Sequence, residues 1–180
     1  SPDFDPVTSN SISGAQPPSP EDPAGPCLSF PRSLANGRGL RLVTWNCHTL
    51  FGAVSGDHTI QKNTFDRLTN LTRANNIICL QETHGHDGDR ESLRSEFPEF
   101  EAFCTFCPEA CAGGNTILIA RSLLAILPIV HHSVLIPGRL HAVTVKSPPS
   151  VASCFSLTIL NLHLDPKCRH LEKIRILSKC

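Results

Sequence analysis

The sequence predicts an α/β protein of the α+β type, in which strands pair within sheets and helices lie outside them. Strand-like apolar segments and segments of helical periodicity alternate through the first part of residues 40–180. Later in the chain, three strand-like segments follow one another with no helix between them. Such a succession favours a meander of neighbouring strands, so the predicted order is β-α-β-α-β-β-β-α.

Residues 1–39 are predicted to form a disordered leader rich in Pro and Ser. They contain eight of the 15 prolines and show no apolar periodicity. A segment of this composition cannot bury enough apolar surface to offset the entropy lost on ordering. Limited proteolysis is therefore expected to remove the leader first and to leave a product that begins near Leu40. A leader that resists the protease would contradict this prediction.

The next part of the chain predicts two strands and two helices. LRLVTWN (40–46) is rich in β-branched and aromatic residues, and NIICLQE (76–82) is a short apolar run, so both are typical of strands. Between them, residues 58–76 repeat apolar positions with the period of a helix, and residues 88–97 predict a second, shorter helix. The apolar positions of the two helices are Phe65, Leu68, Leu71, Leu93 and Phe97.

The last part predicts three strands and a helix. GGNTILIAR (113–121), RLHAVTV (139–145) and SLTILNLHL (156–164) are the strands. Asp165 and Pro166 suit the first turn of a helix, whose apolar stripe is Leu171, Ile174 and Leu177. CTFCPEAC (104–111) is interpreted as a loop with reduced cysteines.

Composition excludes several classes of protein. Charged residues make up 18% and hydrophobic residues 40% of 180 residues, which fits a globular domain. No apolar run is long enough to span a membrane, and no signal peptide is visible, so we expect neither a membrane nor a secreted protein. Nine cysteines at irregular spacing indicate reduced thiols and an intracellular location, the nucleus included. The chain contains no Met, so its first residue is not expected to be a translation start.

Polar side chains end several of the predicted strands. Asn46 ends the first strand, Glu82 ends the second, and His163 lies near the end of the last. Functional groups often gather at strand ends in α/β proteins, so we expect these three to converge at one end of a sheet. A carboxylate there suits a hard cation such as Mg²⁺, and a phosphodiester needs neutralised charge and an activated water.

Five motifs in order carry a resemblance to a known family. The N-terminal half of endonuclease/exonuclease/phosphatase domains resembles residues 40–180, and the endonuclease domains of non-LTR retrotransposons are the most similar subgroup. The motifs are TWN (44–46), CLQETH (79–84), GGNTILIAR (113–121), PGRLHAVTV (137–145) and LTILNLHLDP (157–166).

The resemblance implies a fold, an activity and roles for single residues. The fold is a four-layer β-sandwich with outer helices, of which the first half is expected here. The activity is hydrolysis of a DNA phosphodiester with Mg²⁺, or Mn²⁺ in its place, as cofactor. Glu82 matches the family's metal ligand and Asn46 its strand-end asparagine. His163 matches a phosphate-facing catalytic position, and Arg139 a phosphate-binding one.

The family's later motifs, G-D-x-N and S-D-H, do not follow Leu164. We therefore expect a truncated domain that is inactive alone. Alternatives are a phosphatase or deadenylase of the same superfamily, a degenerate non-catalytic fragment, or a zinc-binding module built on Cys104, Cys107 and Cys111. The remaining histidines are expected at the surface or in a pocket, among them His84, His132 and His141.

Overall fold

The computed structural model describes residues 39–51, 58–108, 113–149, 155–164 and 177–178. The predicted leader lies outside these residues, and so does nearly all of the helix predicted from Asp165 onward. Within the described part, no helix combines the length and apolar character needed to cross a membrane.

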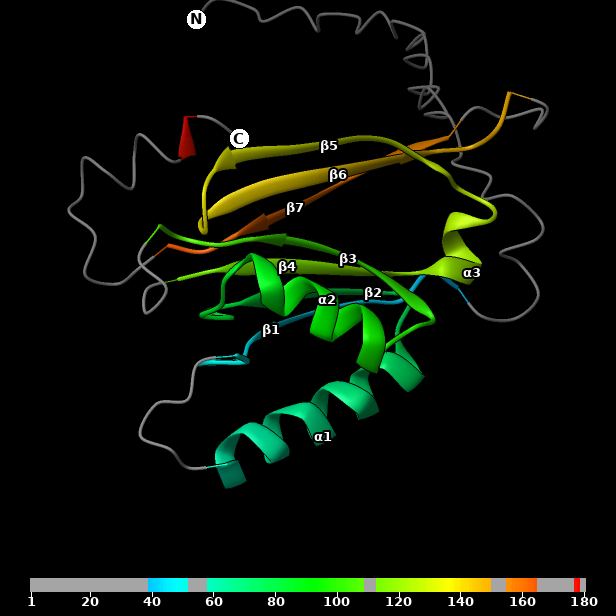
Figure 1. Ribbon diagram of the computed structural model, residues 1–180. Helices are drawn as coiled ribbons and strands as arrows, with labels where there is room; N and C mark the ends of the chain where they lie inside the picture. The colour runs from blue at the N-terminus through cyan, green and yellow to red at the C-terminus, as the bar shows by residue number, and fades with distance from the viewer. Residues whose placement is uncertain (1–38, 52–57, 109–112, 150–154, 165–176, 179–180) are drawn as a thin grey trace, which may run out of the picture.

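Two sheets pack face to face, and two helices cover the outer face of one of them (Figure 1). The first sheet has the order β1-β2-β4-β3, and the second has the order β5-β6-β7. The described elements thus form three successive layers, of helices, first sheet and second sheet, as expected for the predicted sandwich. The elements are β1 (Leu42–Asn46), α1 (His58–Ala74), β2 (Ile77–Gln81), α2 (Asp87–Glu96), β3 (Phe100–Thr105), β4 (Asn115–Ala120), α3 (Arg121–Leu124), β5 (Ile129–Ile136), β6 (Leu140–Lys146) and β7 (Ser156–Leu162).

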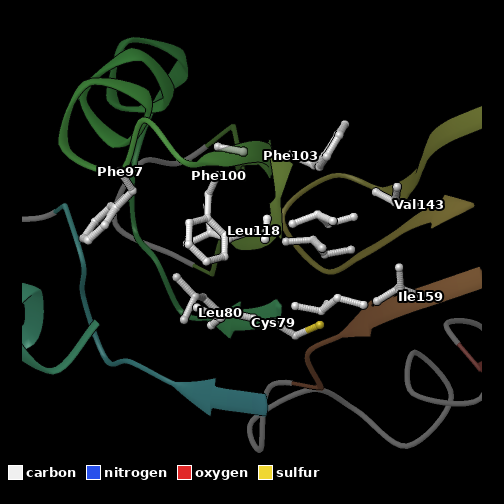
Figure 2. Close-up of a cluster of buried hydrophobic side chains, with 14 of the residues drawn as sticks. Cys79, Leu80, Phe97, Phe100, Phe103, Leu118, Val143 and Ile159 are labelled. Atoms are coloured by element: carbon white, nitrogen blue, oxygen red, sulfur yellow. The ribbon is translucent and has the colours of Figure 1, made fainter. Parts of the chain in front are cut away.

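Burial on both faces explains the continuous apolar runs of β2 and β4. Every residue of these two central strands is buried, because helices cover one face of the first sheet and the second sheet covers the other. Figure 2 shows Val143 and Ile159 reaching from the second sheet toward the cluster that contains Cys79 and Phe103. On the helix side, Phe65 of α1 stacks on Phe97 at a ring distance of 6.3 Å.

Two strands escaped the sequence-based prediction. β3 pairs antiparallel with β4, so Cys104 lies within a strand rather than in the predicted Cys-rich loop. β5 pairs antiparallel with β6 through a register that shifts twice. Glu101 interrupts the apolar pattern of β3, and two histidines interrupt that of β5. Neither strand is therefore recognisable from the pattern of apolar residues. The short helix α3 was also not predicted.

The strand directions bring several strand ends that carry polar residues to one edge of the molecule. β1 and β2 run parallel, with Asn46 opposite Gln81, so their carboxyl ends meet. β4 is antiparallel to β2 and begins at that same edge. In the second sheet, β7 ends beside the start of β6, where His163 N donates to Arg139 O at 2.9 Å.

Candidate active site at the carboxyl ends of β1, β2 and β7

Glu82 occupies an unusual backbone conformation directly after β2. Its φ of 56° lies in the left-handed region, which is uncommon for a residue with a side chain. Thr49 N donates to Glu82 O at 2.7 Å, and Thr83 N donates to Gly114 O at 3.1 Å, so bonds on both sides hold this turn. Backbone strain of this kind persists where surrounding structure imposes it and often marks functional sites.

Gly114 allows the close approach that fixes the same turn. Its own φ is 94°, and a Cβ atom there would lie 2.6 Å from Thr83 Oγ1 and 3.0 Å from His84 N. Both values are shorter than ordinary van der Waals contacts. The glycine before β4 is therefore needed so that the backbone after β2 can pass beside it.

Three side chains converge on the Glu82 carboxylate. Asn46 Nδ2 donates to Oε1 at 2.9 Å, and His163 Nε2 lies 3.0 Å from the same oxygen. His48 Nδ1 lies 2.8 Å from Oε2. The predicted convergence of Asn46, Glu82 and His163 is thereby confirmed, but the prediction of a common sheet is wrong, because His163 follows β7 of the second sheet. The chemical roles assigned to the three residues remain predictions.

The surroundings of Glu82 favour its ionised form. Partial burial acts to raise the pKa of the carboxyl, but hydrogen bonds from Asn46 and His48 and the charges of the His163 and His48 rings act in the opposite direction. The net pKa lies below the ordinary value. At neutral pH the side chain is therefore a carboxylate, the form that accepts hydrogen bonds and binds cations.

Arg139 adds a positive charge next to His163. Its Nη1 lies 3.5 Å from His163 Nδ1. A guanidinium only donates, so this contact leaves the proton of a neutral His163 on Nε2, where it faces Glu82. The arginine follows Gly138, whose φ of 64° forms the turn into β6. The structure thus brings Arg139 to the site as predicted from the sequence, and phosphate binding by it stays a prediction.

The donor set fits a hard divalent cation in one respect. Mg²⁺ in proteins commonly takes one or two carboxylates and keeps several waters, and Glu82 offers one ionised carboxylate that is 18% exposed. Oε1 meets both Asn46 and His163, whereas Oε2 meets His48, so a cation approaches the carboxylate most readily at Oε2, beside the His48 ring. Within the described ranges, no three His, Cys, Asp or Glu side chains already surround a common metal position.

Sequence reasoning missed His48 and the pairing of Thr49 with His84. Thr49 Oγ1 lies 3.3 Å from His84 Nδ1, and burial lowers the pKa of His84, which favours a neutral ring. The spacing of His48 carried no signal, because the chain leaves the extended conformation directly after β1, with left-handed φ values at His48 and Thr49.

The cysteines of the proposed zinc module lie in different settings. Cys104 sits in β3, where burial raises its pKa to about 11. Cys107 follows the strand, with its Sγ 3.8 Å from Pro137 O. Cys111 is outside the described residues. The raised pKa of Cys104 disfavours the thiolate, which is the form that binds zinc.

Comparison with solved structures identifies proteins of similar fold. No protein-family model matches the chain, and no curated protein matches it in sequence. Among solved structures, an AP endonuclease from Leishmania major is similar with a TM-score of 0.53 and 12% identity, over 76% of this chain and 43% of that one. An endonuclease/exonuclease/phosphatase family protein from Bacteroides thetaiotaomicron gives 0.52 and 14%, over 77% and 58%.

Both solved structures share their fold with this chain. The chain spans about half the length of the two solved structures. At this level of identity the likeness shows that the chain has the fold of the endonuclease/exonuclease/phosphatase type, as the sequence motifs predicted.

Proposed function

We propose that this chain carries part of the active site of a metal-dependent phosphodiester hydrolase, with Glu82 as a metal ligand and DNA as substrate. The observation that supports it best is the convergence of Asn46, His48 and His163 on one ionised carboxylate at the strand ends. Two solved structures of the same fold, one of them an AP endonuclease, support the reaction class. The QETH and PGRLH motifs support a retrotransposon-type endonuclease within that class.

Each residue has a distinct role in this proposal. Glu82 holds Mg²⁺ or Mn²⁺, which when bound neutralises phosphate charge and makes a water more acidic. Asn46 orients the carboxylate through its 2.9 Å hydrogen bond. His163 and Arg139 lie side by side and present donors to a phosphate oxygen. We assign this machinery to residues 40–180, as the first half of such a domain.

We further propose that this chain alone binds Mg²⁺ weakly and nicks DNA little or not at all. The described site offers one carboxylate, and no described group of three ligands surrounds a metal position. Weak binding follows, because a second carboxylate or a substrate phosphate normally completes a Mg²⁺ site.

Nicking of supercoiled plasmid with Mg²⁺ tests the function. We expect little or no nicking by the unmodified chain, and any residual rate to fall about tenfold or more in Glu82→Ala, since loss of a metal ligand costs at least as much as loss of its supporting contacts. Glu96→Ala is the matched control, because Glu96 is an exposed carboxylate at the far end of α2 and its removal should leave the rate unchanged.

The possible outcomes separate the claims. Equal nicking by all three proteins would contradict the assignment of Glu82 and point to a contaminant. Fast nicking that disappears in Glu82→Ala would support the function and overturn the expectation of little or no nicking.

A further inference from the structure

The two imidazoles that contact Glu82 differ in their freedom to move. The side chain of His163 is 12% exposed, its backbone N–H is bonded to Arg139 O, and its ring also meets the Arg139 guanidinium. The side chain of His48 is 78% exposed, and its ring contacts Glu82 from the solvent side. Displacing the His48 ring from the carboxylate therefore disturbs fewer contacts than displacing His163.

The backbone nevertheless keeps His48 near the carboxylate. Its φ of 47° is left-handed, and so is the φ of 90° at the next residue, Thr49. His48 N donates to Asn46 Oδ1 at 3.3 Å, and Thr49 N donates to Glu82 O at 2.7 Å. The ring can rotate into solvent, whereas its attachment point stays beside the carboxylate.

The effect of the His48 ring on metal binding depends on the cation. Mg²⁺ prefers oxygen ligands, so it gains little from an imidazole, and the His48 N–H at 2.8 Å from Oε2 opposes its approach to that oxygen. Ni²⁺ and Zn²⁺ bind imidazole readily. For them, the same ring is a ligand that already lies next to the carboxylate.

We propose that His48 sets the metal preference of the Glu82 site, by competing with Mg²⁺ for Glu82 Oε2 and by ligating cations that favour imidazole. The inference rests on the proposed function, which assigns metal binding to Glu82. It predicts that a single substitution changes the affinities for the two kinds of cation in opposite directions.

Calorimetric titration of the full chain with Mg²⁺ and, separately, with Ni²⁺ at one fixed pH tests this. In His48→Ala we expect Mg²⁺ to bind about three- to tenfold more tightly, the change that corresponds to removing one competing hydrogen bond. Ni²⁺ should bind at least about tenfold more weakly. His131→Ala is the matched control, because His131 is an exposed histidine of β5 and should leave both affinities unchanged.

Glu82→Gln separates failure of this inference from failure of the proposed function. Ni²⁺ bound by thiols or by other histidines persists in Glu82→Gln and is subtracted as background. If Mg²⁺ binding is the same in Glu82→Gln as in the unmodified chain, the metal site itself is wrong. If Mg²⁺ binding depends on Glu82 but His48→Ala leaves both affinities unchanged, or shifts them in the same direction, only the role of His48 is overturned.

Discussion

Replacing Asn161 with alanine is expected to lower the free energy of unfolding by roughly 3 kcal/mol. Asn161 belongs to β7 of the second sheet, yet its side chain bonds to the first sheet. Its Nδ2 donates to Leu80 O at 2.9 Å and to Thr116 O at 3.0 Å. Its Oδ1 accepts from Gln81 Nε2 at 2.6 Å. The side chain is 1% exposed, so its loss leaves buried groups without these partners and a cavity between the sheets.

Urea unfolding of Asn161→Ala and of Thr158→Ala measures this effect against a matched control. Thr158 lies on the same strand, is exposed, and its hydroxyl bonds across the sheet surface to that of Thr144 at 3.0 Å. Its substitution is expected to change the free energy of unfolding by less than about 0.5 kcal/mol. Equal effects of the two substitutions would show that Asn161 does not join the sheets.

The part of the fold that follows from local pattern was predictable from the sequence. β2 and β4 are short apolar runs with turn residues near them, and α1 and α2 carry clear helical stripes. β5 was not predictable in this way, because His132 and His131 break its pattern, and its pairing with β6 includes two register shifts. The strand forms through its pairing with β6, and no local window of sequence contains that information.

In the candidate site, too, some residues could be predicted from local sequence and others could not. Asn46 and Glu82 were predictable because parallel neighbouring strands bring their carboxyl ends together. His48 was missed because it lies beyond β1, where left-handed φ values turn the chain back toward Glu82. Those angles depend on contacts with Glu82 O and Thr83 O, which lie more than 30 residues away in the sequence.

The prediction for His141 was wrong. A histidine near a strand start was expected at the surface or in a pocket, but this side chain is 0% exposed. It packs between the sheets, with its ring 5.8 Å from that of His132, which in turn meets Phe103 at 5.1 Å. Neither ring nitrogen of His141 has a hydrogen-bond partner among the described residues. A protonated ring in this position would carry an unpaired buried charge.

Acid is therefore expected to destabilise the fold through His141. Burial, assisted by the charge of His132, lowers the pKa of His141 to about 3 from the ordinary value of 6.5. The unfolded chain then binds a proton as the pH falls below about 6.5, whereas the folded chain does not. Stability from this group is fully present above that pH and decreases by about 1.4 kcal/mol per pH unit below it, until the pH nears the folded pKa.

Urea unfolding at pH 7.5 and pH 5.5 tests this, because most carboxyl groups stay ionised over that interval. The unmodified chain is expected to lose about 1.4 kcal/mol through His141, and His141→Leu should not show that part of the loss. His131→Leu, which removes an exposed histidine of the neighbouring strand, should keep it. If His141→Leu loses as much stability as the unmodified chain between the two pH values, the buried ring is not the source of the acid sensitivity.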